Sequence, residues 1–216
     1  MTRGSDSNQL DRRKRRSRAA LRAGLLELIG VKPYDTITID DVADTADVSR
    51  ATFYAHYRDK ADLLAELSDE MISEAAARAT SIPAQDTQPG AAARYSGSAA
   101  AQVIVHAAEH RDLYQLVLSG AGGKEPRKRL ISSLQTAVAS VFSRLADTLE
   151  RTPRMPMEII SRAFTGALLA VIEAWLAGEY EGTPDEIAAI FMHGQVDGLQ
   201  WALGLNEGEL AFSPPH

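Results

Sequence analysis

The chain has 216 residues, of which 45% are hydrophobic, and a formal net charge of −6. It has no cysteine, which excludes both a disulfide framework and a thiolate metal site. No run of 18 apolar residues is present, and the N-terminus has no apolar signal region. We therefore expect a soluble, cytoplasmic protein with no membrane partner.

The charge is distributed unevenly along the chain. Residues 1–60 carry a net charge of +3, and the rest of the chain carries −9. Five consecutive cations, Arg12–Arg16, stand just before the first apolar-periodic segment. Such a block repels itself, so we interpret it as a basic arm that neutralises DNA phosphates or enters a minor groove. A solvated helix start is the alternative.

The first 37 residues predict a tail and one helix. Residues 1–10 show no apolar periodicity and are expected to be disordered. Leu21, Leu25 and Leu28 then follow at helical spacing, and this helix is expected to stop at Gly30, with Pro33 beyond it.

Residues 38–64 are the most informative stretch. Thr38 and Asp41 predict a capping box at the start of a short helix. Ser49 is placed to cap a second helix over 50–57, and Asp59 a long third helix that reaches about residue 81. Two short helices joined by a tight turn form the motif that fits a DNA major groove.

In that motif the first turn of the second helix meets base edges, and the flanking polar and aromatic residues hold the phosphates. Phe53 and Tyr57 have a simpler interpretation as core aromatics. The residues that we predict at DNA are Arg12, Arg13, Arg16, Thr38, Ser49, Arg50, Ala51, Thr52, Tyr54, His56, Tyr57 and Lys60.

The order Arg18-x-x-Leu21, Gly30, Thr36–Ala43, Ala46–Ser49, Phe53-Tyr54-x-His56-Tyr57 and Lys60-x-x-Leu63-Leu64 resembles the tetracycline-repressor (TetR) family of bacterial regulators. The resemblance implies that Arg50, Ala51 and Thr52 contact bases and that the other motif residues hold the DNA backbone. The chain departs from the family at Asp47, which stands where the family usually has glycine, and at Tyr57, which replaces the usual phenylalanine.

The resemblance implies an all-α fold with an N-terminal three-helix helix-turn-helix DNA-binding domain and a C-terminal helical ligand-binding and dimerisation domain. We expect a disordered tail at 1–10, the DNA-binding domain at 11–64, the regulatory domain at 65–205 and a frayed tail at 206–216. The implied function is a repressor that binds a palindromic operator in double-stranded DNA as a homodimer and is released by a small-molecule effector.

The rest of the chain predicts further helices after a loop over 83–98. Residues 156–177 are apolar on nearly every side, and Thr183, Pro184 and Glu186 mark the start of a last helix. These two helices resemble the family's dimerisation pair. The predicted dimer residues are Leu168, Ile172, Trp175, Ile187, Ile190, Phe191, Gly194 and Gly198, and the predicted effector contacts are Met71, Ile104, Tyr114, Phe142, Phe164 and Leu168.

Two alternatives belong to other classes of protein. His106, Glu109 and His110 match the H-x-x-E-H pattern of some zinc hydrolases, but no downstream carboxylate pair in a matching helix accompanies them. We therefore expect no metal, no cofactor and no catalytic residue. The second alternative is a helix-turn-helix adaptor that binds protein instead of operator DNA.

Overall fold

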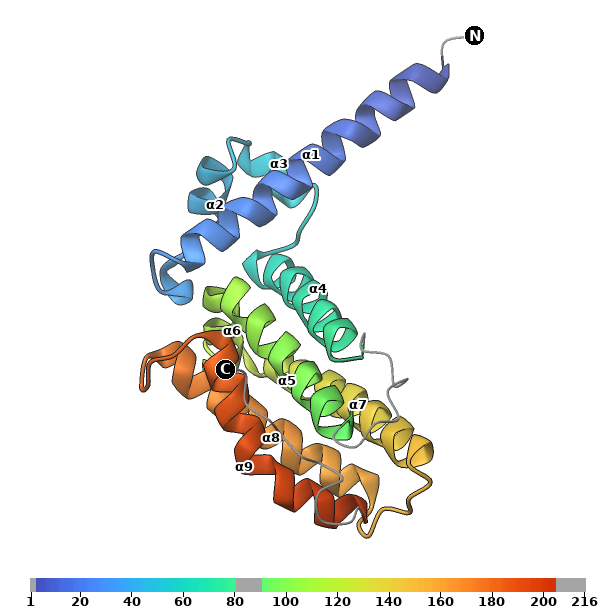
Figure 1. Cartoon of the computed structure of the whole chain (residues 1–216). Helices are drawn as coiled ribbons and strands as arrows, with labels where there is room; N and C mark the ends of the chain where they lie inside the picture. Colours follow the sequence, from blue (N-terminus) through green and yellow to red (C-terminus); the bar gives the residue numbers. More distant parts are fainter. Residues whose placement is uncertain (1–2, 81–90, 205–216) are drawn as a thin grey trace.

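The computed structural model describes residues 3–80 and 91–204, which form nine α-helices and one short 3₁₀ helix and contain no strand (Figure 1). In chain order the elements are α1 (Arg3–Ile29), η1 (Tyr34–Thr36), α2 (Ile39–Thr45), α3 (Arg50–Tyr54), α4 (Lys60–Thr80), α5 (Ala91–Glu109), α6 (Arg111–Ser119), α7 (Lys124–Thr148), α8 (Met157–Ala177) and α9 (Pro184–Leu203). The predicted all-α class is confirmed.

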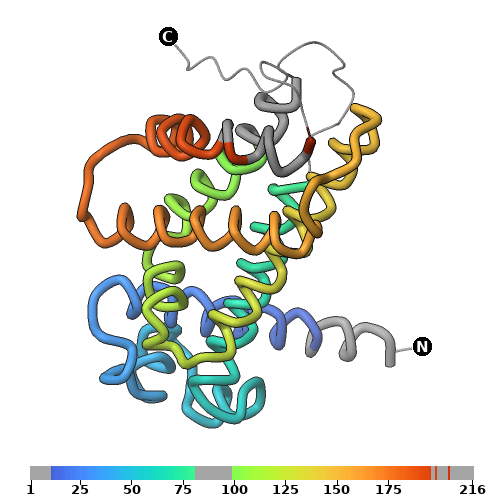
Figure 2. The backbone as a smooth tube through the Cα atoms, turned by 90° about the horizontal axis from the view of Figure 1, so that it is seen from below, coloured from blue at the N-terminus to red at the C-terminus, as the bar shows by residue number. Residues whose placement is uncertain are grey.

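Helices α1–α3 gather at one end of the molecule, which we call the head (Figures 1 and 2). Leu21, Leu25 and Phe53 are fully buried between them. A Cβ at Gly24 would lie 3.3 Å from two backbone atoms of the α2 region, so the glycine permits the close packing of α1 on α2.

The N-terminal helix is longer than expected. The predicted disordered tail over 1–10 is wrong for residues 3–10, because α1 already begins at Arg3 and projects beyond the head (Figure 1). Extending an existing helix adds one hydrogen bond for each residue that is fixed, and no proline interrupts this segment. The predicted tail at 206–216 lies outside the described residues.

Helix α4 begins where the sequence predicts, since the Asp59 carboxylate accepts a hydrogen bond from the backbone N–H of Asp62 at 2.8 Å. Its first half is joined to α1 by ion pairs, Arg18 with Glu66 at 2.5 Å and Arg22 with Glu70. The helix also packs on α5 and α7. One helix is thus shared by the head and the rest of the chain.

Helices α5–α9 form the body, in which α7 packs on α4 and α8, and α5 packs on α9 (Figure 2). Its core contains Leu134, Phe142, Leu168 and Ile172, each no more than 1% exposed. The body and the head share one continuous apolar core. The predicted loop over 83–98 is wrong from residue 91 onward, because α5 starts there in a run of alanines with high helix propensity.

Both ends of α8 and the start of α9 lie within one residue of their predicted positions. Gly178, with φ of +82°, ends α8, and Thr183 and Glu186 form a capping box at the start of α9. Helix α8 alone among the described helices has the length and apolarity of a membrane span, but it is half buried against its neighbours. It is a core helix of the body, which explains its apolar character.

Candidate functional site

The helix-turn-helix is shaped by two side-chain caps. Thr38 accepts from the backbone N–H of Asp41 at 3.1 Å, and the Asp41 carboxylate accepts from that of Thr38 at 2.7 Å. Ser49 accepts from the backbone N–H of Thr52 at 3.1 Å at the start of α3. Both predicted caps are confirmed, and together they fix the start of each helix of the motif.

The turn between the two helices requires an unusual backbone conformation at Asp47. Its φ is +51°, in the left-handed region where glycine is preferred. The backbone N–H of Asp47 donates to the carbonyl of Asp44, and that of Val48 donates to Ala43, so the turn is hydrogen-bonded on both sides of the residue. Aspartate tolerates this conformation better than most residues, which explains how it can replace glycine here.

Helix α3 presents three exposed residues, Arg50, Ala51 and Tyr54. The Arg50 guanidinium makes two hydrogen bonds of 2.8 and 2.9 Å to the Asp40 carboxylate and a longer one of 3.4 Å to the Tyr54 hydroxyl. These partners raise the pKa of Arg50, first through Tyr54 and then through Asp40. Arg50, the predicted base-reading residue, therefore lies on the outer surface, where the Asp40 carboxylate of α2 holds its guanidinium group.

Arg12, Arg13 and Arg16 of the basic arm are exposed on α1, as are Lys14 and Arg15. An open hollow on the surface is lined by Arg13 and Arg16 of the arm and by Ala51, Thr52 and His56 of the α3 region. The fold thus brings the arm and the recognition helix to one face. A helix is about 10–12 Å wide and the minor groove only about 6 Å, so a helical arm fits phosphate contact and not minor-groove insertion.

Two predicted DNA contacts are turned inward. Tyr57 is 3% exposed, packs on Phe53 and accepts a hydrogen bond from Arg18 at 3.3 Å, so its hydroxyl does not reach the outer surface. The Lys60 ammonium donates to the backbone carbonyls of Tyr34 and Ile37 at 2.5 and 2.6 Å. These two residues stabilise the head, and the predicted role of Tyr57 at the DNA surface is wrong.

His56 joins α1 to the end of α3 through a 2.8 Å hydrogen bond between its Nε2 and the Ser17 hydroxyl. Partial burial lowers the pKa of the imidazole, and the nearby Arg18 and Lys14 lower it further. His56 is therefore neutral at neutral pH and positions the arm beside α3.

Two family models match this chain. The model described as bacterial regulatory proteins, tetR family, matches residues 21–67, and a model of a transcriptional regulator C-terminal region matches residues 98–193. The chain belongs to the TetR family. The structure is similar to that of a TetR regulator from Streptococcus agalactiae 2603V, with a TM-score of 0.64 and 19% identity over 87% of this chain and 98% of that one.

The fold is also similar to that of the fatty acid degradation regulator FadR from Bacillus halodurans. Its TM-score is 0.68, with 13% identity over 82% of this chain and 92% of FadR. The HTH-type transcriptional regulator YxbF of Bacillus subtilis (strain 168) is 39% identical over 67 residues, which is 31% of this chain and 18% of YxbF. The match therefore spans under a fifth of that curated relative.

The body of this TetR-family protein contains a small apolar cavity between α4, α5, α7 and α8. Its internal space is about 10 Å³, the room of a single water molecule. Three of the predicted effector contacts, Phe142, Phe164 and Leu168, line it, whereas the other three, Met71, Ile104 and Tyr114, are buried elsewhere. The rest of the wall consists of small and branched residues that were not predicted, which are Ala79, Ala99, Ala100, Val103, Leu134, Val138 and Val141.

The predicted dimer residues divide into two groups. Ile190 is 70% exposed, and Gly194 and Gly198 are also on the outer face of α9. The prediction is wrong for the other five, which lie within the core of the chain because α8 and α9 turn their bulkier stripes inward. Those five are Leu168, Ile172, Trp175, Ile187 and Phe191, none more than 7% exposed.

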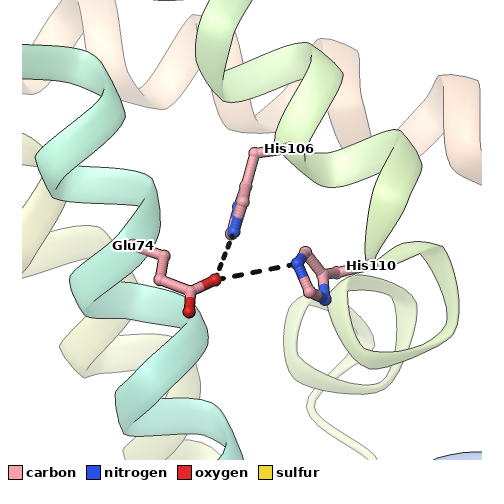
Figure 3. Close-up of side chains that lie close together, drawn as sticks. All are labelled: Glu74, His106 and His110. Atoms are coloured by element: carbon pink, nitrogen blue, oxygen red, sulfur yellow. Dashed lines mark hydrogen bonds and ion pairs between the residues drawn. The ribbon is translucent and has the colours of Figure 1, made fainter. Parts of the chain in front are cut away.

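The H-x-x-E-H segment is arranged differently from a hydrolase site. Glu109 forms a 2.6 Å ion pair with Arg78 of α4, whereas Glu74 of α4 lies beside both histidines (Figure 3). For this pattern a metal-binding carboxylate is expected downstream of the histidines, whereas Glu74 comes 32 residues upstream of His106 and has no sequence motif in common with it. Only tertiary packing of α4 on α5 brings it there.

Proposed function

We propose that this TetR-family transcriptional regulator binds a palindromic operator in double-stranded DNA as a homodimer in the cytoplasm, and represses transcription until a small molecule occupies its body. The proposal depends chiefly on one observation, which is that a capped α3 and the basic arm lie on the same face of the head. A protein-binding adaptor has no need of a cationic helix beside the recognition helix.

The face supports two kinds of DNA contact. Arginine can make a bidentate bond to guanine and alanine can contact a thymine methyl group, so Arg50 and Ala51 at the start of α3 suit the major groove. The arm on the same face suits the phosphates beside that groove. On binding, Arg50 would give up its two hydrogen bonds to Asp40. Operators that offer it two hydrogen bonds from a base edge would therefore be preferred.

The dimer is supported by the outer faces of α8 and α9. On α8, Ala163, Gly166 and Ala170 are exposed at helical spacing, and on α9 Ile190, Gly194 and Gly198 are exposed. Among these, a Cβ added to Gly166, Gly194 or Gly198 would meet nothing within 4 Å in the single chain. Small apolar residues in that pattern allow close approach of helices from a second copy, and a twofold dimer matches a palindrome.

The effector is proposed to be an apolar or amphipathic small molecule, because all the residues that line the cavity are hydrophobic. Ligand pockets for drug-sized molecules measure about 300–1,000 Å³. The cavity is far smaller than this, so binding would require α4, α5, α7 and α8 to move apart. The ligand would thereby favour a second conformation by its difference in affinity for the two.

The route from the cavity to the head is short. Ala79 at the end of α4 lines the cavity, and the same helix carries Glu66 and Glu70, which hold α1. A second contact joins the end of α1 to α6, where a Cβ on Gly30 would lie 2.9 Å from a carboxylate oxygen of Asp112. Movement of α4 would therefore reorient the head and change the separation of the two recognition helices.

The test is selection of bound sequences from random double-stranded DNA by the full chain. We expect an enriched palindrome whose half-sites are centred one helical turn apart, about 34–36 Å, or a multiple of it. Enrichment of an asymmetric single site would contradict the dimer. No enrichment at all would contradict operator binding and favour the adaptor.

A further inference from the structure

Three potential metal ligands meet at the junction of α4, α5 and α6. Glu74 comes from the middle of α4, His106 from the last turn of α5, and His110 from the break between α5 and α6. Figure 3 shows both imidazoles directed at the same carboxylate. The nearest ligand atoms of the three residues all lie within 4.8 Å of one another.

The separations are long for hydrogen bonds and close to those between two ligands of one metal ion. Glu74 Oε2 lies 3.4 Å from Nε2 of His106 and 3.8 Å from Nε2 of His110, whereas good hydrogen bonds between such groups measure about 2.7–3.2 Å. Zinc binds imidazole nitrogen and carboxylate oxygen at about 2.0–2.2 Å, which puts neighbouring ligands of a tetrahedron about 3.4 Å apart. Small side-chain adjustments would place all three at that spacing.

The buried imidazole is also held in the orientation that a ligand needs. His106 is fully buried, and its Nδ1 lies 3.0 Å from the hydroxyl of Tyr114, which is itself fully buried. In the tautomer whose Nδ1–H donates to Tyr114, the lone pair of Nε2 is directed at the cluster. Metal-binding histidines commonly have such a partner on the other nitrogen, which fixes both ring orientation and tautomer.

The cluster is open on one side. The side chains of Glu74 and His110 are 50% and 36% exposed, so an ion can enter from solvent and keep a water molecule as a fourth ligand. Glu109, the acid within the histidine motif, is engaged by Arg78. The carboxylate at the cluster therefore comes from another helix, and an ion would cross-link α4 to the junction of α5 and α6.

We propose that Glu74, His106 and His110 form a binding site for one divalent transition-metal ion such as zinc. Two imidazoles and one carboxylate are donors that suit this class of ion, and cysteine is not needed. The ion would fix α4 against α5 and thereby restrict the helix that carries the head. This regulatory consequence rests on the proposed function, whereas metal binding itself does not.

The test is titration of the full chain, freed of metal with a chelator, with Co(II) followed by competition with Zn(II). Tetrahedral cobalt gives a visible absorption spectrum, and we expect saturation at one ion per chain. Glu74→Gln and His110→Ala should each weaken binding at least tenfold. Glu109→Gln, one turn away, and His193→Ala, an exposed histidine of α9, serve as matched controls and should bind as the wild type does.

Two results would overturn the site. One is the lack of a cobalt spectrum in the wild type while circular dichroism shows the folded protein. The other is equal binding by the wild type and by the Glu74→Gln, His110→Ala double variant. If the chain binds cobalt at this site but selects no DNA, the metal site is supported and the proposed function is contradicted. If the chain selects DNA but binds no cobalt, the proposed function is supported and the metal site is contradicted.

Discussion

The left-handed turn residue gives the sharpest prediction about the head. Asp47 has a φ of +51°, and this conformation costs an ordinary non-glycine residue about 1–2 kcal/mol. Alanine at this position must adopt the same left-handed conformation, which it tolerates less well than aspartate does. We therefore expect Asp47→Ala to lower the free energy of unfolding by about 1 kcal/mol. For a chain of this size that change lowers Tm by about 2–4 °C.

Replacement by glycine should change stability little. Glycine removes the strain, but it also gives the unfolded chain more freedom, which costs about 0.4–1 kcal/mol. Asp47→Asn, which tolerates the same conformation, should also stay near the wild type. Thermal unfolding followed by circular dichroism should therefore rank alanine below asparagine, aspartate and glycine.

The same three variants of Asp47 distinguish the effect of backbone strain from the effect of charge. All three replacements remove an anion from the surface proposed to face phosphates, so each should tighten binding to duplex DNA by a similar factor, and added salt should reduce that factor. The measurement is fluorescence anisotropy with a labelled duplex. Glu150 is the matched control, because its φ is +53° and it lies at the end of α7. Glu150→Ala should lower Tm in the same way and leave DNA affinity unchanged.

Two results would refute this reasoning. If Asp47→Ala is as stable as Asp47→Asn, the left-handed conformation carries no cost at this turn. If only Asp47→Gly tightens DNA binding, turn geometry and not charge controls affinity.

Three further predictions concern the arm, the dimer and pH. Replacing the basic arm by glutamines should weaken binding to all DNA sequences. The slope of log K against log salt, measured by anisotropy, should flatten by about 0.9 for each phosphate that the arm neutralises, and an unchanged slope would exclude phosphate binding by the arm. Ile190→Glu should weaken the dimer at least tenfold in analytical ultracentrifugation, whereas Val31→Glu, at a comparably exposed residue of the head, should not; equal dimerisation would exclude the outer face of α9. Because the pKa of His56 is lowered from its usual value of 6.5 in the folded state, protonation favours unfolding, and stability should fall as pH drops below about 6.5. His56→Gln should show a smaller decrease of Tm over that range, and an equal decrease would exclude His56 as a cause.

The sequence predicted those parts of the structure that local chemistry determines. Thr38, Ser49, Asp59 and Thr183 each begin a helix through a bond to a backbone N–H a few residues away. Such bonds are encoded by spacing along the chain. The helix-turn-helix and the start of α9 could therefore be located without any knowledge of packing.

The errors arose where packing selects among several apolar faces. Helix α8 is apolar nearly all round, so the sequence could not show that Ile172 faces the core while Gly166 faces outward. Tyr57 was assigned to the DNA surface by its position in the motif, but its burial follows from its packing against α1 and Phe53. Glu74 joined the histidines only through the packing of α4 on α5.

The most direct test of DNA recognition is to repeat the selection from random DNA with Arg50→Ala beside the wild type. We expect the variant to select the same palindrome, with relaxed preference at one base pair in each half-site and roughly 10- to 100-fold weaker binding to the wild-type sequence. An identical consensus selected with unchanged affinity would show that Arg50 does not read a base, and would contradict the proposed placement of α3 in the major groove.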